Sequence, residues 1–289
     1  MIVKSMKISD LTIPNTIDGG YLIQALDGLQ NADAKLPFVD FPTRHGALLL
    51  NNLYVTRKIA VGIEVVGTSA EDFIAKRLEL MEALSIARTT EIPLEFTLRN
   101  DAVIITSGMV KTVRDGTGLG QITNGRITAE FECYDPALYE STLNQETIHL
   151  RDIAGGAEIP AEIPMALGAA DDEGMAVCTN AGNFLSYPSI QITGVCLNPI
   201  IQNGTTGKEL QFNVELTGAN DYISIDMKNQ AATMTVGGNV TNIMPYLDST
   251  KNDFWWLDPG DNEVIFTHEG VYNENVVAYI TWRSAYIGV

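Results

Sequence analysis

The sequence predicts a mainly β fold with a single helix, and three features of the pattern support this. Apolar and polar residues alternate with a period of two along many short segments, as expected for strands with one buried face. Turns rich in Gly, Asn and Asp separate these segments. Only one stretch has helical periodicity. We therefore expect two β domains, the first with a helix lying across its sheet.

The clearest strands of the first half are IAVGIEVVG, from residue 59, and GRITAEFEC, which ends at residue 133. Their alternating apolar residues are Ile59, Val61, Ile63 and Val65 in the first, and Ile127, Ala129, Phe131 and Cys133 in the second. In the second half the same alternation predicts strands at 188–195, 210–216, 222–227, 262–268 and 276–282.

The helix is predicted at residues 68–85. Thr68 and Glu71 have the spacing of a capping box, in which the side chains at the first and fourth positions satisfy free backbone N–H groups. Ile74, Leu78, Met81 and Leu84 then recur on one face. Such a stripe favours packing on a sheet, with contact to a partner as the alternative.

The domain boundary is predicted just after the segment FECYDP. The strand pattern stops there, and Pro136 cannot continue a central ladder. We expect residues 1–137 to form the first β domain and residues 138–289 the second, a β-sandwich.

The charge of the chain excludes several function classes. Its formal net charge is −18, and no stretch concentrates Lys and Arg as a phosphate-binding surface requires, so sequence-specific nucleic-acid binding is not expected. No apolar run reaches the roughly 18 residues of a membrane span, and the start of the chain lacks the apolar core of a signal peptide. An acidic surface suits a solvated protein, or the wall of a conduit through which DNA passes without sticking.

No catalytic or metal-binding motif is present, so the sequence predicts neither an enzyme nor a cofactor. His45, His149 and His268 lie in unrelated contexts, and the three cysteines form no CxxC pair, which fits a reducing folding environment. The acidic run 171–173 favours a solvated loop over a cation site. Asp258 and Asp261 in LDPGDNEV are more typical of a turn than of a glycosidase acid/base pair.

The adjacent residues Trp255 and Trp256 are the most informative local feature. Neighbouring residues on a strand face opposite ways, so one ring points outward or into an interface. We expect one Trp in the sandwich core and the other in a domain or subunit contact. Stacking of an exposed Trp on a sugar ring is the alternative.

Segments along both halves resemble the distal tail proteins of siphophages. In the second half these are YPSIQITGVCLNPIIQNGTTGKEL (187–210), YISID (222–226), FWWLDPGDNEVIF (254–266) and the final ITWRSAYIGV. In the first half they are RHGALLLNN, IAVGIEVVG, the capped helix and FECYDP. Each motif is structural, and the resemblance depends on their joint order over most of the chain.

The resemblance implies a structural baseplate-hub protein of a long-tailed phage. Its N-terminal domain would be tail-tube-like, a split barrel or sandwich, and would close into a hexameric ring through which DNA passes. Its C-terminal domain would be a galectin-like β-sandwich. The implied partners are further copies of the chain, the tail-tube protein, a tail-tip or tail-associated lysin protein, and receptor-binding or baseplate proteins. The implied location is the virion tail tip, after assembly in the host cytoplasm.

Five residues are candidate contacts between subunits or with partners: Ile74, Leu78, Met81, Trp255 and Trp256. As a hypothesis, the ring interface involves residues 59–65, 68–85 and 127–133.

Two other functions stay open. One is a carbohydrate-binding module that uses Trp255 or Trp256, and the other is a β-sandwich glycoside hydrolase that uses paired carboxylates.

Overall fold

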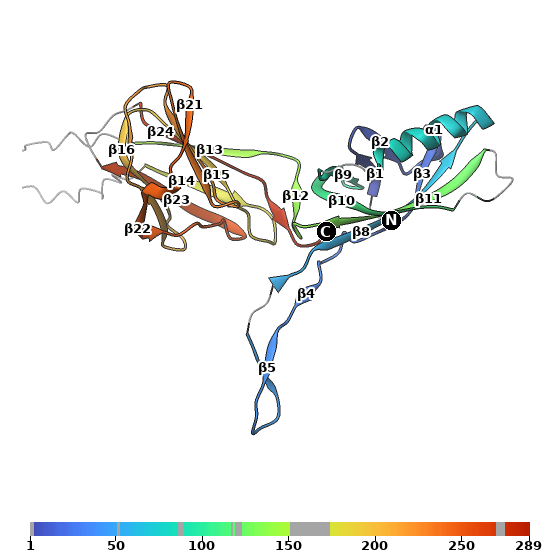
Figure 1. The fold of residues 1–289 in the computed structure, drawn as a ribbon, viewed down its shortest axis with the longest axis horizontal. Coiled ribbons are helices and arrows are strands. Elements are labelled where there is room, and N and C mark those ends of the chain that lie inside the picture. The colour runs from blue at the N-terminus through green and yellow to red at the C-terminus, as the bar shows by residue number, and fades with distance from the viewer. Residues whose placement is uncertain are drawn as a thin grey trace, which may run out of the picture. The chain divides into compact units, whose positions relative to one another are not determined.

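The structure is a computed structural model that describes residues 3–50, 53–85, 90–116, 118, 123–150, 174–269 and 275–289. Strands dominate it, and the described residues hold one α-helix (Figure 1), so the predicted fold class is confirmed. The chain divides into two units. The N-terminal unit comprises Met1–Ser141 together with Tyr286–Val289, and the C-terminal unit comprises Thr142–Ala285. The division lies just beyond the predicted one, and the last residues, which the sequence assigned to the second domain, are part of the first unit.

The N-terminal unit is built on a nine-stranded sheet with the order β2-β1-β9-β10-β11-β8-β3, in which β12 pairs with β10 and β25. The strands are β1 (Val3–Ile8), β2 (Leu11–Pro14), β3 (Tyr21–Asp27), β8 (Arg57–Val66), β9 (Ile92–Leu98), β10 (Val103–Asp115), β11 (Asn124–Cys133), β12 (Leu138–Glu140) and β25 (Ala285–Tyr286). The first part of β10 pairs with β9 and the second part with β11. Residues of both halves pack in one core. The end strands β2 and β3 meet at the isolated bridge of Asn15 with Leu22 and not along a full ladder, so the sheet is not a closed barrel.

The predicted alternation is confirmed in β8 and β11. Their apolar residues are fully buried, namely Ile59, Val61, Ile63, Val65, Ile127, Ala129, Phe131 and Cys133. Both strands lie inside the sheet, with a hydrogen-bonded neighbour on each side. They therefore offer only a face, and no free edge, to another molecule.

The helix α1 (Ala70–Ala83) begins differently from the prediction. Its N-cap is Ser69, whose hydroxyl accepts the N–H of Asp72 at 3.2 Å. Thr68 instead donates its N–H and its hydroxyl to the Asp72 carboxylate, at 2.7 and 3.0 Å. The capping box predicted from Thr68 and Glu71 is therefore wrong by one residue, because the serine that follows the threonine is equally able to cap.

The buried face of α1 also differs from the predicted stripe. Phe73, Leu80 and Ala83 pack in the core, followed by Leu84. Ile74 and Leu78 are 53% and 58% exposed. The prediction that these two pack on the sheet is wrong, because the larger Phe73 ring, outside that stripe, occupies the core.

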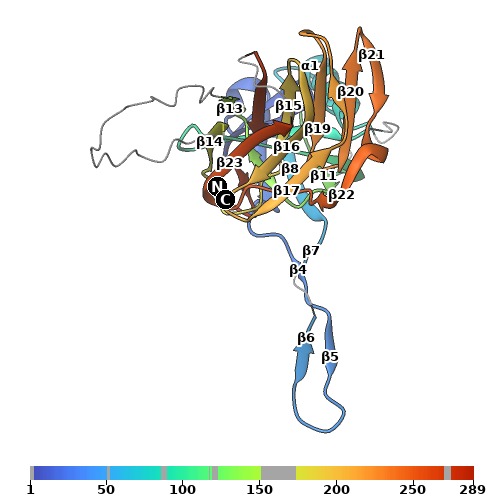
Figure 2. The ribbon, with the colours of Figure 1, turned by 90° about the vertical axis from the view of Figure 1, so that its left-hand side faces the viewer.

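A long two-stranded arm projects from the N-terminal unit (Figures 1 and 2). It consists of residues 34–50 with 53 and 54, in which β4 (Ala34–Lys35) pairs with β7 (Leu53–Tyr54), and β5 (Phe38–Asp40) pairs with β6 (Ala47–Leu49). Gly46, with φ near +100°, forms part of the turn, where its carbonyl accepts the N–H of Phe41 at 3.2 Å. A backbone at this φ favours glycine.

The C-terminal unit is a sandwich of two six-stranded sheets around one core. The first sheet has the order β13-β24-β15-β19-β20-β21, and the second has β14-β23-β16-β17-β22 with β18 on β16. The first comprises β13 (Asn144–His149), β15 (Ser189–Thr193), β19 (Tyr222–Asp226), β20 (Ala231–Val236), β21 (Asn239–Asn242) and β24 (Val277–Trp282). The second comprises β14 (Gly174–Asn180), β16 (Cys196–Asn203), β17 (Lys208–Phe212), β18 (Glu215–Leu216), β22 (Leu247–Asn252) and β23 (Gly260–Glu269).

Most strands predicted for this half are present, but the one at 210–216 is interrupted. β17 ends at Phe212, where the N–H of Asn213 turns to the carbonyl of Tyr246 at 2.8 Å, and β18 starts at Glu215. The alternation of apolar residues continues from β17 into β18, although the backbone hydrogen bonds change partner between the two strands. A pattern of apolar residues cannot indicate such a change.

Candidate functional site

The arm exposes apolar side chains on both of its faces. The register places Phe38 opposite Leu49, and Val39 opposite Leu48. Successive residues of a strand point to opposite faces, so one pair lies on each side of the ribbon. These four side chains are between 53% and 63% exposed. A ribbon with two apolar faces gains free energy only when another surface covers it.

A second exposed apolar surface lies on α1. Ile74 and Leu78 occupy successive turns and face away from the sheet, whereas Met81 is partly buried against the core. Of the three helical residues predicted as contacts, Ile74 and Leu78 expose enough apolar surface to contact another subunit or a partner protein, whereas Met81 does not.

The two tryptophans lie in different surroundings. Trp255 is fully buried, and its Nε1 donates to the carbonyl of Ile201 at 3.4 Å. The Nζ of Lys208 lies 3.7 Å from the centre of the Trp256 ring, and Trp256 Nε1 donates to Asp258 at 3.0 Å. Trp255 is thus closed to any ligand. Lys208 covers one face of Trp256, so sugar stacking on this pair is not favoured.

The carboxylates of LDPGDNEV have structural partners. Asp258 accepts from Trp256, and Asp261 accepts the hydroxyl of Thr179 at 2.7 Å. The fully buried Asn262 closes the turn, since it accepts the N–H of Asp258 at 2.9 Å and donates to the carbonyls of Asp258 and Gly260. The arrangement is that of a hydrogen-bonded turn, as the sequence favoured.

The described residues hold no group of three His, Cys, Asp or Glu side chains placed to bind a metal ion. The acidic run 171–173 lies outside the described residues.

Burial raises the pKa of Cys133 to about 11 and those of Cys178 and Cys196 to about 12, so all three free thiols stay protonated at neutral pH. No helix in the described part of the chain is long and apolar enough to cross a membrane.

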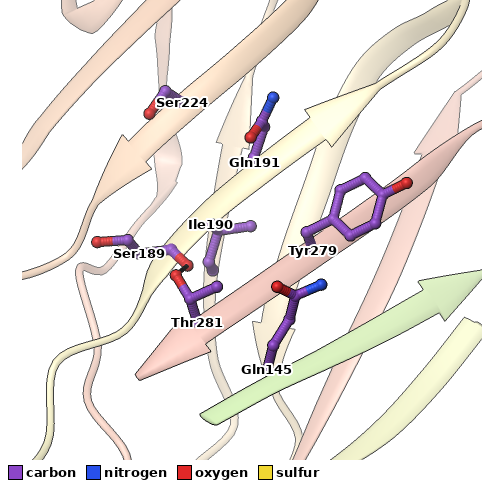
Figure 3. Close-up of a pocket in the computed structure, with 7 residues that line it drawn as sticks. All are labelled: Gln145, Ser189, Ile190, Gln191, Ser224, Tyr279 and Thr281. Atoms are coloured by element: carbon purple, nitrogen blue, oxygen red, sulfur yellow. Dashed lines mark hydrogen bonds between the residues drawn. The ribbon is translucent and has the colours of Figure 1, made fainter. Parts of the chain in front are cut away.

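A shallow trough of about 330 Å³ lies on the outer face of the first C-terminal sheet (Figure 3). Two rows of side chains line it, and in each row the register places one residue on each of three neighbouring strands. The rows are Gln145–Thr281–Ser189 and Tyr279–Gln191–Ser224. Ile190, on the opposite face of its strand, is buried in the core and reaches the trough only from beneath.

Sequence reasoning did not find the arm or the trough. The sequence feature that could have indicated the arm is the apolar run Leu48–Leu50, which follows a segment with Pro and Gly. This run lacks the alternation of a half-buried strand. For the trough, the alternation indicated the outward residues of each strand, but which of them are neighbours depends on the order of the strands, which the sequence does not show.

Residues 181–286 match the family model described as siphovirus-type tail component, C-terminal domain. No curated protein matches the chain. Among solved structures, the chain is similar to the Dit protein of SPP1, described as a paradigm of the hub adsorption apparatus in phages that infect Gram-positive bacteria. The two share 15% identity with a TM-score of 0.67, over 97% of this chain and 98% of that one.

The chain is also similar to chains of the phage P2 baseplate in its activated conformation. With the calcium-bound structure the identity is 12% and the TM-score 0.54, over the whole of both chains. With the strontium-bound structure the identity is 13% and the TM-score 0.55, over 99% of both chains. At these identities the similarity establishes a shared fold that covers both units.

Proposed function

We propose, from the confirmed resemblance to the distal tail proteins of siphophages, that this protein is a structural component of a phage tail hub. In finer detail, six copies form a ring that joins the tail tube to the tail tip or baseplate and lets DNA pass. The role is mechanical, without catalysis or a cofactor. The family of residues 181–286 and the fold of both units support this role.

The exposed apolar faces of the arm are the main observation in support of ring formation. Its two faces expose Phe38 with Leu49 on one side, and Val39 with Leu48 on the other. Covering only one face would leave the other in water, so the arm fits between surfaces rather than on one. A head-to-tail contact with a second copy satisfies this geometry, and repeating the same contact closes a ring.

The exposed face of α1 supplies a complementary surface on the same unit. Ile74 and Leu78 are the apolar residues that the helix does not bury. We assign them to the subunit interface, together with the outward faces of β8 and β11. The proposed interface therefore keeps the elements expected from the sequence and adds the arm.

The remaining partners follow from the proposed position in the tail. The ring meets the tail-tube protein on one side and a tail-tip or tail-associated lysin protein on the other, while the C-terminal sandwich, galectin-like in form, holds receptor-binding or baseplate proteins. The protein is assembled in the bacterial cytoplasm and resides at the virion tail tip. The net charge of −18 suits a channel wall along which DNA slides.

The ring is tested by removing one apolar face of the arm. The double variant Phe38→Ser with Leu49→Ser removes two side chains whose burial contributes roughly 3 to 6 kcal/mol to each interface, at least about a hundredfold in affinity. We expect the unchanged protein to sediment as a hexamer and to show a ring with a central hole by negative stain. The variant is expected to sediment as a monomer with the same unfolding midpoint.

The matched control removes two apolar side chains elsewhere. Ile17 and Val240 are 62% and 67% exposed and lie outside the arm. The double variant Ile17→Ser with Val240→Ser should still form the hexamer. An unchanged protein that stays monomeric at high concentration, or an arm variant that remains hexameric, contradicts the proposal.

A further inference from the structure

The trough on the C-terminal sandwich is lined by uncharged polar side chains. Its outward-facing residues carry three hydroxyl groups of Ser and Thr, two Gln amides and one Tyr. In a chain with 36 acidic and 18 basic residues, a continuous surface from four strands without a charge is a distinctive feature.

The row through Tyr279 continues the same chemistry across the sheet. Thr147 lies opposite Tyr279 on β13, and Thr233 lies opposite Ser224 on β20, followed by Asn242 on β21. The full row thus has one uncharged polar residue on each of six strands. At about 4.8 Å between strands, it extends over roughly 24 Å.

The outer face of the second sheet has a different character. It carries the ion pair of Lys251 with Glu209, at 3.6 Å, and the exposed carboxylate Glu263. It also exposes Met175 and Val177, each about half exposed. The first row of the trough also ends at a carboxylate, since Asp226 lies opposite Ser189 on β19. The neutral polar surface is therefore a property of the trough and of the row through Tyr279, and not of the sandwich as a whole.

Most polar groups in the trough are available to a ligand. Thr281 donates its hydroxyl to the carbonyl of Ser189 at 3.1 Å. Within the described part of the chain, the side chains of Gln145, Gln191, Ser224 and Tyr279 form no hydrogen bond to protein. Hydroxyl and amide groups both donate and accept, so this set matches a ligand that also presents both functions at many positions.

We propose that this trough binds an uncharged saccharide. Saccharide hydroxyls donate and accept as the Ser, Thr and Gln side chains do, and the Tyr279 ring offers an apolar face to the C–H groups of a sugar. Phosphate or carboxylate groups would meet no cation in the lining and a protein of net charge −18. A protein partner would need a broad apolar interface core, whereas the apolar groups of this trough are the Tyr279 ring and Ile190 beneath it.

The proposed site is formed by residues of a single copy of the chain and includes neither Trp255 nor Trp256. Its residues project from paired strands of a sheet, which holds them in a fixed arrangement (Figure 3). Rigid placement lowers the entropy that is lost when a ligand binds.

The test measures saccharide binding to the full protein. The probes are an array of neutral oligosaccharides of glucose, galactose and N-acetylglucosamine, with a polyol-phosphate polymer for contrast. We expect a neutral oligosaccharide to bind. Gln191→Ala and Tyr279→Ala are each expected to raise its dissociation constant by about three- to tenfold, as the loss of one neutral contact predicts.

Matched substitutions on other surfaces serve as controls. Gln202→Ala lies on β16 of the other sheet, and Tyr246→Ala replaces a 53% exposed ring in the 3₁₀ turn Met244–Tyr246. Both should leave the dissociation constant unchanged, and all four variants should keep the unfolding midpoint. The proposal is overturned if no neutral oligosaccharide binds, if the phosphate polymer binds better, or if the control variants weaken binding equally. Sedimentation of the same samples reports ring formation independently.

Discussion

Asp72 organises the first turn of α1 through its carboxylate. It accepts the N–H and the hydroxyl of Thr68 and pairs with Lys76 at 3.0 Å. These contacts, the Thr68 N–H first among them, lower the pKa of Asp72 from 3.8 to about 2. Its stabilising effect is therefore complete above pH 4 and is lost as the pH falls toward 2.

We predict that Asp72→Asn reduces the pH dependence of the free energy of unfolding on the acid side. Between about pH 4 and pH 2 the unchanged protein should lose helix stability, and the variant should lose less, because it has no proton to gain. The helical circular dichroism signal, followed during urea unfolding at several pH values, measures this. Asp10→Asn, which replaces an exposed carboxylate between β1 and β2, should leave the profile as it is. Equal profiles for Asp72→Asn and the unchanged protein would contradict the assignment.

The strand β10 changes partners where Gly108 lies. Residues up to Gly108 pair with β9, and those from Met109 pair with β11. A Cβ at Gly108 would lie 2.7 Å from the Sγ of the buried Cys133. The change of partner strand therefore occurs at a position where the close approach of Cys133 favours a residue without a side chain.

We predict that Gly108→Ala destabilises the N-terminal unit by roughly 1 to 3 kcal/mol, the usual cost of overpacking a core. Combined with Cys133→Ala, which removes the sulfur, the cost should be less than the sum of the two single changes. Free energies of urea unfolding for the four proteins of this cycle test the prediction. Strictly additive costs would mean that the sulfur is not the obstacle.

The sequence predicted several strands well where one face of the strand is buried. In β8 and β11 the alternation marks the core directly, because each second residue is fully buried. It predicted poorly where both faces of an element are apolar. The arm has no period of two, and α1 carries apolar residues on two faces, of which Phe73 rather than Ile74 packs inward. Which of two apolar faces packs in the core depends on the neighbouring elements. The residue pattern of one element contains no information about its neighbours.

At the scale of the whole molecule, Arg57 joins distant parts of the N-terminal unit. Its buried guanidinium donates to the carbonyls of Gly28, Gln30, Pro136 and Ile287, at 2.5 to 2.8 Å. Burial lowers the pKa of Arg57, and these four acceptors offset the loss of water around the charge. The sequence did not predict this contact, since nothing local relates residue 57 to residue 287.

We predict that removal of residues 286–289 destabilises the N-terminal unit by at least about 2 kcal/mol, because Arg57 loses a charged hydrogen bond in a buried position. All three tryptophans lie in the C-terminal unit, so Trp fluorescence follows that unit alone. The fluorescence transition should be unchanged while the helical signal melts earlier. A matched loss in both signals would show a general effect, contrary to this expectation.

The hydrogen bond from Arg57 to Ile287 also has a consequence during translation. The two residues are 230 positions apart in the chain, and at about 5 to 20 residues per second the ribosome needs roughly 10 to 50 s to make the intervening segment. Until then the buried guanidinium lacks one acceptor, and the N-terminal unit cannot reach its full stability. The whole C-terminal sandwich is synthesised within this interval. A nascent chain in which the sandwich is not yet complete therefore has a less stable N-terminal unit, and we expect it to be at a disadvantage in joining the proposed ring.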